Sequence, residues 1–311
     1  MTTPYFDDNW PEDHKSGVIA VVGRPNVGKS TLINAVLGQK IAIASPKPQT
    51  TRRVQLGIYS TEQVQLLFTD TPGLHAPRNT LGEYMINAAE QSLKDADLIL
   101  WILDVSEPLQ KPDEYIAETI QTVRGDTPVI LVYNKIDLAP GDDFSAFANL
   151  TAHEEAVAIS ALKETGIDTL LEAIIAHVPQ GPRYYPIDQV SDLNMRFIAS
   201  EVVREKVILH TEKEVPHSVA VEITEYKNRN DGERADIYAV IYVEKDSQKG
   251  IVIGKGGKMI KRIGTEARHE LEAMLDQHVF LDLRVKVLKN WRSNEQFMRR
   301  VGYSLPKEDG E

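Results

Sequence analysis

The sequence predicts two folded domains, an open doubly wound α/β domain with a mostly parallel sheet and a smaller α+β domain after it. Short apolar runs that alternate with amphipathic stretches over residues 17–178 indicate the first domain. A change to alternating strand patterns after a proline-rich run indicates the second. With 311 residues, the chain is long enough to form two hydrophobic cores. We therefore expect a flexible tail at 1–16, a linker at 179–191 and a C-terminal domain at 192–311.

The strands of the first domain are expected at five apolar runs that are rich in Val, Ile and Leu. Runs without strict polar alternation are typical of strands buried on both faces of a parallel sheet. The amphipathic stretches between them, such as 80–95 and 114–124, are expected to be helices. Ligands of such sheets bind beyond the carboxyl ends of the strands, so the polar residues there are site candidates. The five runs are 17–23, 64–70, 97–105, 128–134 and 156–160.

The second domain is expected to follow the order α-β-β-α-α-β. A helix is predicted over 192–210, and strands are predicted at 218–226 and 235–245 with a polar turn between them. A glycine-containing junction then leads into a helix that ends near Gln277, and the strand-like run 279–288 follows it. The helices would pack against one sheet of three strands.

The composition limits the class of protein. The chain has no cysteine, which excludes disulfides and thiolate metal sites. Its first sixteen residues are polar and acidic and do not resemble a signal peptide. No apolar stretch reaches membrane-spanning length, so we expect no transmembrane segment and a cytoplasmic location.

Charge is distributed unevenly along the chain. The net charge is −11, but residues 1–183 hold 14 basic and 24 acidic side chains, whereas residues 184–311 hold 21 and 22. Within the second half, residues 245–262 carry six basic side chains and one acid, Asp246. A basic strip on a nearly neutral domain can bind phosphates, although the same pattern also fits a solvated helix face.

A phosphate-binding loop is predicted where the first strand ends. Residues 23–30, GRPNVGKS, fit the pattern G-x-x-x-x-G-K-[ST] and lie between a strand and a helix, the context that this motif needs. Glycines let backbone N–H groups wrap phosphate oxygens, Lys29 can reach the β- and γ-phosphates, and Ser30 can bind Mg²⁺. The expected nucleotide contacts of this loop are Gly23, Asn26, Val27, Gly28, Lys29, Ser30 and Thr31.

Residues 70–73, DTPG, close a later strand and are expected to face the same phosphates. Asp70 can hold Mg²⁺, and the Gly73 N–H can bond the γ-phosphate. In the loop before this strand, a Thr hydroxyl can complete the Mg²⁺ shell; Thr51 is preferred and Thr50 is the alternative. The expected metal ligands are Ser30, Thr51 and Asp70, the catalytic residues are Lys29, Thr51 and Gly73, and Thr71 and Pro72 join the nucleotide site.

Catalysis is expected to lack a glutamine that orients water. Many GTPases carry Gln after the DxxG glycine, but this chain has Leu74. We therefore expect slow intrinsic turnover. Asn26 is a candidate ligand for K⁺ beside the phosphates, and a turn-stabilising Asn explains it equally well.

A guanine site is predicted at the next two strand ends. In residues 134–137, NKID, the Asp137 carboxylate can accept bonds from guanine N1–H and its amino group, which adenine does not offer. The SALK sequence at 160–163 can bring backbone N–H groups to the guanine O6. The expected base contacts are Asn134, Lys135, Asp137, Ser160, Ala161 and Leu162, and the ordered set of motifs indicates a GTP hydrolase.

An RNA-binding loop of the KH type is predicted in the second domain. The sequence IGKGGKMI at 253–260 contains G-x-x-G with lysines inside and after it, and a KH loop of this kind clamps about four nucleotides. A glycine-rich helix junction without RNA is the alternative. The expected order α-β-β-α-α-β is that of the type II KH fold found in bacterial proteins. The expected RNA contacts are Ile253, Gly254, Lys255, Gly256, Gly257, Lys258 and Ile260.

Taken together, GRPNVGKS, PQTTR, DTPG, NKID, SALK, PRYYP and VIGKGGKMIKRIG resemble the Era family of bacterial GTPases from residue 17 to about Trp291. The resemblance implies a Mg²⁺-dependent enzyme that converts GTP to GDP and phosphate. It also implies a KH domain bound to the single-stranded 3′ end of 16S rRNA, a role in assembly of the small (30S) ribosomal subunit, and peripheral association with the inner membrane face. Two alternatives stay open, a P-loop small-molecule kinase and a signalling GTPase whose second domain binds protein or lipid.

Overall fold

We analysed a computed structural model, which describes residues 10–43, 47, 50–74, 79–139, 141, 143–229 and 233–303. The chain divides into two compact units, one built mainly from the N-terminal half as far as Asp192 and one that begins at Leu193. Lys47, Thr50 and residues 79–84 belong to the second unit. Each unit has its own hydrophobic core, as the sequence predicted.

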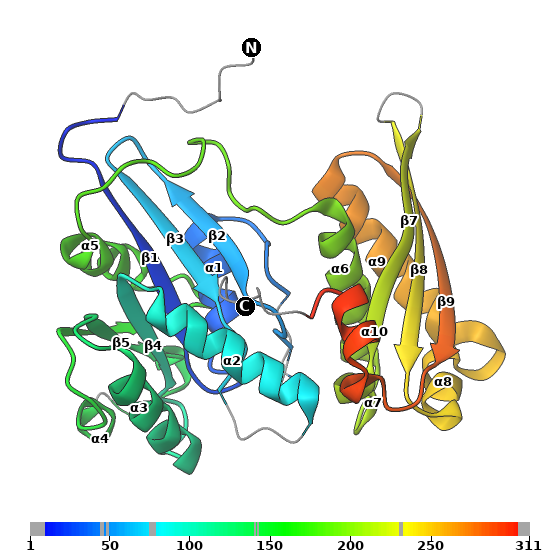
Figure 1. The fold of residues 1–311 in the computed structure, drawn as a ribbon, viewed down its shortest axis with the longest axis horizontal. Coiled ribbons are helices and arrows are strands. Elements are labelled where there is room, and N and C mark those ends of the chain that lie inside the picture. The colour runs from blue at the N-terminus through cyan, green and yellow to red at the C-terminus, as the bar shows by residue number, and fades with distance from the viewer. Residues whose placement is uncertain are drawn as a thin grey trace, which may run out of the picture. The chain divides into compact units, whose positions relative to one another are not determined.

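The first unit contains a six-stranded sheet in the order β2-β3-β1-β4-β5-β6 (Figure 1). All neighbours are parallel except β2, which runs antiparallel to β3. The doubly wound, mostly parallel sheet that the sequence predicted is therefore confirmed. The strands are β1 Lys15–Val22, β2 Gln55–Ser60, β3 Val64–Asp70, β4 Leu98–Asp104, β5 Val129–Asn134 and β6 Glu155–Ile159.

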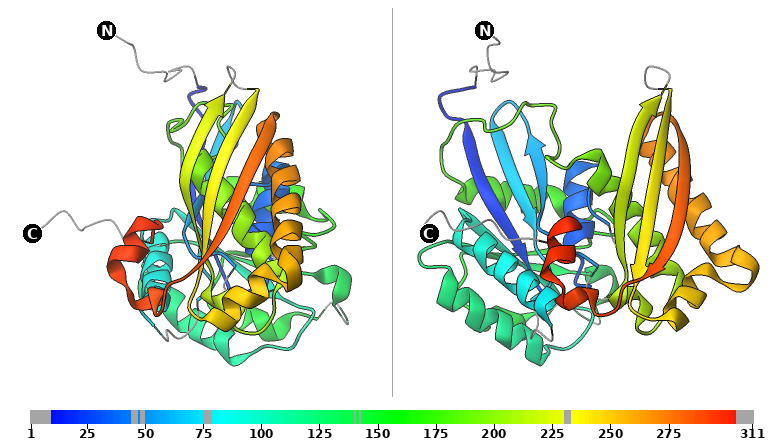
Figure 2. Two further views of the ribbon diagram at one scale, coloured as in Figure 1. Left: turned by 90° about the vertical axis from the view of Figure 1, so that its right-hand side faces the viewer. Right: turned by 45° about the vertical axis from the view of Figure 1, so that its right-hand side comes forward.

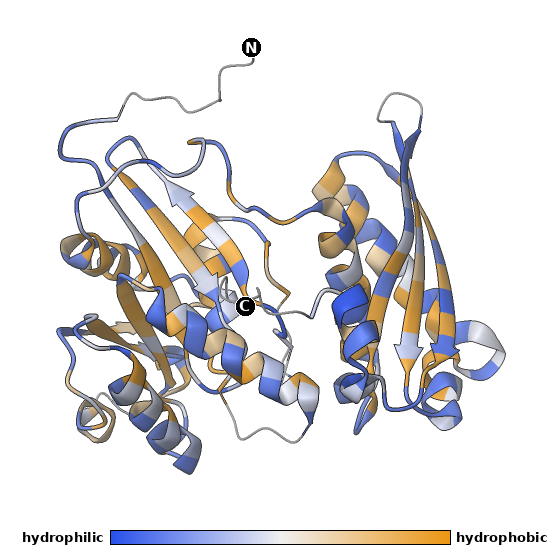
Figure 3. Ribbon diagram, in the orientation of Figure 1, coloured by the Kyte–Doolittle hydropathy of each residue, from blue (hydrophilic) through white to orange (hydrophobic). Residues whose placement is uncertain are grey.

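Helices cover both faces of this sheet. Leu32 of α1 and Leu170 of α5 belong to the core on one face, whereas Leu93 of α2 and Ile116 of α3 belong to the core on the other. The central strand β4 is buried along its whole length, and it appears hydrophobic in Figure 3. The helices are α1 Lys29–Leu37, α2 Thr80–Lys94, α3 Lys111–Val123, η1 Ile136–Leu138, α4 Ser145–Ala148 and α5 Ile167–His177.

Two boundaries of the first unit differ from those expected. The tail was expected to reach residue 16, but His14 is buried and β1 already begins at Lys15. The segment 179–191 was expected to be a linker, and the structure shows it bound to the first unit. The Ser16 N–H donates to the Pro179 carbonyl, and the Gln65 side chain accepts from the Tyr184 N–H. Polar side chains hid these backbone pairings from the sequence patterns.

Among the described residues, the second unit has the expected order α-β-β-α-α-β, extended by four short helical segments, α7, η3, η4 and α10. Its sheet has the order β7-β8-β9, with β7 antiparallel and β9 parallel to β8. Helices α6 and α9 pack on one face of the sheet (Figure 2), where Val203, Ala267 and Ile237 meet in one core. The elements are α6 Met195–His210, α7 Val215–Ser218, β7 Ala220–Arg229, β8 Arg234–Val243, α8 Asp246–Ile253, η3 Lys255–Gly257, α9 Lys258–Leu275, β9 His278–Val287, η4 Trp291–Ser293 and α10 Glu295–Arg300.

No described helix is both long and apolar enough to cross a membrane.

Candidate functional site

The phosphate-binding loop connects β1 to α1, and Gly28 stands directly before the helix. Gly28 adopts a φ of 105°, a conformation that side chains disfavour. A Cβ atom on Gly28 would lie 2.2 Å from the side-chain nitrogen of Asn134, so only glycine fits here. The loop therefore ends at a helix N-terminus, where backbone N–H groups are available to an anion.

Lys29 lies inside the loop as expected. Its ammonium group is buried and donates to the carbonyls of Gly23, at 3.0 Å, and Arg24, at 2.8 Å. Burial lowers the pKa of Lys29 to about 8, and the nearby Asp70 carboxylate opposes that shift. A buried cation that is held by neutral carbonyls is stabilised when anionic phosphate oxygens come within reach.

Ser30, Thr51 and Asp70 converge at the expected metal position. The Ser30 hydroxyl donates to Asp70 Oδ2 at 2.7 Å, and the Thr51 hydroxyl donates to the same oxygen at 3.1 Å. The two hydroxyl oxygens are 3.0 Å apart. The other carboxylate oxygen, Asp70 Oδ1, is buried without a hydrogen-bond partner among the described residues. Three hard oxygen donors with one unsatisfied carboxylate oxygen fit Mg²⁺, which prefers oxygen ligands.

The two threonines that are candidate metal ligands make different contacts. Only Thr51 contacts Ser30 and Asp70, whereas the Thr50 hydroxyl donates to the Lys47 carbonyl at 2.6 Å. Burial raises the pKa of Asp70, and the charge of Lys29 and the hydroxyl bonds oppose that shift. A cation at this position would favour the ionised carboxylate further.

The DTPG turn lies against the phosphate-binding loop. A Cβ atom on Gly73 would lie 2.8 Å from the Pro25 nitrogen, which places Gly73 in close contact with the loop. The Thr71 hydroxyl donates to the Val21 carbonyl at 2.7 Å, so this side chain anchors the turn to β1. Leu74 is completely buried and belongs to the core that includes α2, and its side chain offers no polar atom.

Arg24 and Asp113 were not singled out from the sequence, yet they fix the loop. Arg24 is 8% exposed, and its Nε donates to Asp113 Oδ1 at 2.8 Å. Asp113 is completely buried in the first turn of α3, where its Oδ2 accepts from the Gln110 N–H at 3.1 Å. The polar first turn behind Pro112 was the one available signal, because acids there commonly cap helices.

Asn134 joins three of the predicted motifs. Its side-chain nitrogen donates to the Val27 carbonyl at 2.7 Å, and its side-chain oxygen accepts from the Ala161 N–H at 2.9 Å. Both side-chain groups of Asn134 are thus engaged within the protein. Asn134 therefore holds the phosphate loop, NKID and SALK in register.

The remaining base-site residues leave one carboxylate open. Asp137 is exposed in η1, and among the described residues its carboxylate has no hydrogen-bond or ion-pair partner. Lys135 forms an ion pair with Asp104, which closes β4 beside Asn134 in the sheet register. Leu162 is 73% exposed, although Ser160 and Ala161 beside it are buried. An exposed Leu side chain and a free carboxylate at neighbouring strand ends suit a flat base with N–H donors.

The GxxG loop forms a tight junction between α8 and α9. Gly254 has a φ of 72°, and a Cβ atom on it would lie 2.6 Å from that of Met259, so a side chain would clash. Lys255 and Lys258 are exposed at this junction, whereas Ile253 and Ile260 are half-buried against the core. The lysines are thus available to phosphates, and the isoleucines support the helices.

A groove continues from the loop between α9 and β9. It has a volume of about 320 Å³, and Ile260, Gly264, Leu281 and Leu283 are among its lining residues. A Cβ atom on Gly264 would lie 3.3 Å from Leu283, so glycine brings the helix close to the strand. Of the two isoleucines that were expected to contact RNA, Ile260 lines this groove and Ile253 does not. The alternation in β9 was the signal that could have shown Leu281 and Leu283 on one face.

Comparison with known proteins assigns both units. A family model described as 50S ribosome-binding GTPase matches residues 18–135, and a KH domain model matches residues 214–292. GTPase Era of Caldanaerobacter subterraneus subsp. tengcongensis is 47% identical over 298 residues, which cover 94% of this chain and 99% of that relative. GTPase Era of Staphylococcus haemolyticus is 45% identical, with 94% and 98% covered.

Solved structures agree over the same length. A crystal structure of Era in complex with MgGDPNP and nucleotides 1506–1542 of 16S ribosomal RNA matches with a TM-score of 0.88 and 40% identity, covering 94% of this chain and 100% of that one. A variant of Aquifex aeolicus Era bound to GDP.AlF4- matches with a TM-score of 0.87, also at 40% identity. The chain therefore belongs to the GTPase Era family.

Proposed function

We propose that this protein hydrolyses GTP and binds the single-stranded 3′ end of 16S rRNA through its KH domain during assembly of the 30S subunit. The observation that carries the proposal is the presence of both sites in one chain, the convergent Ser30, Thr51 and Asp70 cluster and the exposed GxxG lysines. Membership of the Era family and the rRNA bound to the related Era structure support it.

The phosphate loop binds and orients the substrate. Lys29 and the N–H groups at the start of α1 contact the β- and γ-phosphates, and the Gly73 N–H holds the γ-phosphate from the DTPG side. Ser30, Thr51 and Asp70 hold Mg²⁺ beside them. When bound, Mg²⁺ neutralises charge on the phosphate oxygens. The geometry of the loop is maintained by Arg24, whose ion pair with Asp113 is buried.

Guanine is selected by the exposed carboxylate of Asp137. The carboxylate accepts from N1–H and the amino group of guanine, whereas adenine leaves it without those donors. A small-molecule kinase with the same phosphate loop would not need this residue. Competition between labelled GTP and unlabelled ATP distinguishes the two, because the GTPase predicts that ATP does not displace GTP.

Turnover depends on the backbone and on bound cations. Leu74 is buried in the core and supplies no polar atom to a water molecule. We propose that K⁺, held at Asn26 beside the phosphates, assists in place of a side chain. Asn26 lies in the phosphate-binding loop and adopts a left-handed conformation with a φ of 66°.

The RNA is clamped by the GxxG loop and extends along the groove between α9 and β9. Lys255 and Lys258 neutralise phosphates, and the apolar wall formed by Ile260, Leu281 and Leu283 receives bases. Crosslinking of the protein to RNA in cells, followed by sequencing, tests this partner directly. Enrichment of the 16S rRNA 3′ end supports the proposal; recovery of no RNA would favour the signalling GTPase with a protein or lipid partner.

The family resemblance also implies peripheral association with the inner face of the cell membrane. We propose that any such association is reversible and mediated by the surface of the protein. Release of the protein from isolated membranes by high salt would support this proposal, and its retention there would oppose it.

A further inference from the structure

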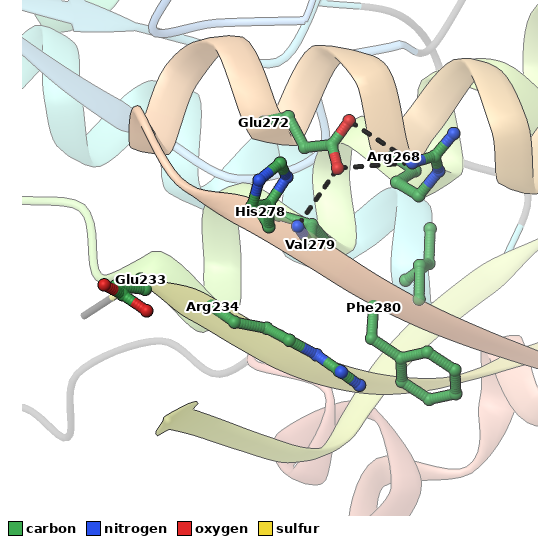
Figure 4. A pocket seen from close by; sticks show the side chains of 8 residues that line it. Glu233, Arg234, Arg268, Glu272, His278, Val279 and Phe280 are labelled. Carbon is green, nitrogen blue, oxygen red and sulfur yellow. Dashed lines mark hydrogen bonds and ion pairs between the residues drawn. The ribbon is translucent and has the colours of Figure 1, made fainter. Parts of the chain in front are cut away.

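The groove of the KH domain is followed by a second, larger pocket at its far end. This pocket has a volume of about 540 Å³, and Arg234, Arg268, His278 and Phe280 contribute to its lining (Figure 4). It shares Arg268 and Leu281 with the groove, so the two adjoin on the helix side of β9, whereas Phe280, which alternates with Leu281 along the strand, lies on its other side (Figure 4). Arg268 lies ten residues along α9 from Lys258, which places the pocket roughly 15 Å from the GxxG loop at 1.5 Å per helical residue.

Phe280 is the aromatic side chain of this pocket. Its side chain is 42% exposed. Among the described residues of the second unit, it is the one large apolar side chain that is both aromatic and exposed. A single exposed apolar residue is ordinary on a protein surface. Phe280 differs because it lines a concave pocket whose volume falls within the roughly 300–1,000 Å³ of typical ligand sites.

The ring of Phe280 is held in place by its neighbours. The guanidinium of Arg234 lies 5.3 Å from the ring centre, and the ring of Tyr238 meets it edge-on at 5.8 Å. Arg234 is itself fixed by an ion pair with Asp236 at 2.8 Å. Because the Phe280 ring is held in place, it loses little conformational entropy when a flat partner stacks on it. The Arg234 guanidinium can stack on the same partner.

The helix side of the pocket carries polar groups that are also fixed. Arg268 pairs with Glu272 at 3.2 Å, and Glu272 Oε1 accepts from the Val279 N–H at 3.1 Å (Figure 4). Figure 4 shows Arg268 and Glu272 on the helix side of the edge strand β9 and Phe280 and Arg234 on its other side. The pocket therefore extends around the strand edge, with guanidinium and carboxylate groups on one side and the aromatic face on the other. This combination suits a nucleobase, which has a flat ring and an edge of donors and acceptors.

We propose that this pocket receives a nucleobase of the RNA beyond the nucleotides that the GxxG loop and groove bind, and that Phe280 is its stacking platform. The proposal rests on the RNA-binding function proposed above. The base is recognised mainly by stacking on the ring and on the Arg234 guanidinium, which tolerates different sequences. The pocket therefore lengthens the RNA segment that the domain holds and adds affinity at the end remote from the loop.

The test measures the affinity of the full chain for nested single-stranded fragments of nucleotides 1506–1542 of 16S rRNA, lengthened one nucleotide at a time. The wild-type protein should gain affinity at the step that first fills the pocket. Phe280→Ala should reduce that gain by about fivefold or more, the fold-change expected for losing one base stack. Phe280→Tyr should retain it, because the ring remains.

Two controls separate the pocket from other effects. Tyr115→Ala removes an equally exposed ring from α3 of the first unit and should leave every RNA affinity unchanged. The shortest fragment that binds should bind Phe280→Ala as tightly as the wild type. An abasic nucleotide at the pocket step should weaken binding to the wild type and have little effect on Phe280→Ala.

The proposal is overturned if Phe280→Ala binds every fragment within twofold of the wild type. It is also overturned if Phe280→Ala lowers the affinity for the shortest fragment as much as the affinity for the longest, because the ring would then only support the structure of the groove. Failure of the wild type to bind any fragment, or equal binding by a Lys255→Asp/Lys258→Asp variant, would instead contradict the RNA-binding function itself. The two failures are therefore distinguishable.

Discussion

At the nucleotide site, Lys29 and Asp70 are 6% and 0% exposed and are held by short hydrogen bonds within the protein. At the GxxG loop, Lys255 and Lys258 are exposed on a turn that only glycines can form. The first arrangement fixes a few buried groups for one small ligand, and the second presents exposed charges to a polymer. Substitutions at the nucleotide site should therefore change specificity and rate, whereas substitutions at the loop should change salt-dependent affinity.

The largest effect is expected for base selection. Asp137→Asn exchanges an acceptor for a donor at the guanine edge. This change should weaken the binding of GTP and strengthen the binding of xanthosine triphosphate. The change in preference should be on the order of 10⁴, the discrimination available to a site built on such bonds. Competition binding with both nucleotides measures it, with Asp126→Asn at an exposed turn as the matched control. Unchanged GTP affinity together with no gain for xanthosine triphosphate would remove Asp137 from the base site.

The next effect concerns the chemical step. Lys29→Ala removes a buried cation that faces the phosphates, and the rate of GTP hydrolysis should fall by about 10²–10³. Single-turnover hydrolysis at saturating GTP measures the rate, and thermal unfolding checks that the variant is folded. Lys94→Ala, at the exposed end of α2, should hydrolyse GTP like the wild type. A fall of less than about threefold for Lys29→Ala would contradict the role given to Lys29.

The smallest effect is expected for the contribution of K⁺ to GTP hydrolysis. Replacing K⁺ by Na⁺ should slow hydrolysis by the wild type, and it should slow Asn26→Ala much less. The buried position of Leu74 motivates this experiment, because it leaves no side chain there to orient water. Hydrolysis rates in the two salts provide the comparison. Equal wild-type rates in both would leave catalysis to Mg²⁺ and the backbone alone.

Prediction from the sequence succeeded where a structural feature depends on a short local pattern of residues. All five apolar runs became strands; four are largely buried, whereas β6, at the edge of the sheet, buries only Val157 and Ile159, contrary to the expected burial on both faces. The glycine motifs marked their loops because positive φ angles favour glycine. Strand β2 was missed because Gly57 interrupts its pattern. The structure explains that glycine, since a Cβ atom there would lie 2.8 Å from Leu37 of α1.

The supporting contacts of the site could not be predicted in the same way. The bonds of Asn134 to Val27 and Ala161 join loops that are far apart in the sequence, and the expected contact of Asn134 with the base stays a prediction. The ion pair between Lys135 and Asp104 likewise depends on the register of β4 and β5. Such contacts arise from strand order and register, which motifs alone do not specify.

The central claim is that the two sites are separate, with GTP bound in the first unit and RNA clamped by the GxxG loop. The most direct test measures RNA affinity against salt concentration for the wild type and for Lys255→Asp/Lys258→Asp, with GTP affinity measured on the same samples. A matched control, Lys286→Asp/Lys289→Asp, makes the same charge change at exposed positions off the loop.

We predict that the loop variant loses RNA affinity steeply, that its salt slope shrinks by about two phosphate contacts, and that its GTP affinity is unchanged. The control variant should keep a salt slope close to that of the wild type. RNA binding by the loop variant with wild-type affinity and slope would contradict the account, because the exposed lysines at the GxxG junction would then not be the clamp.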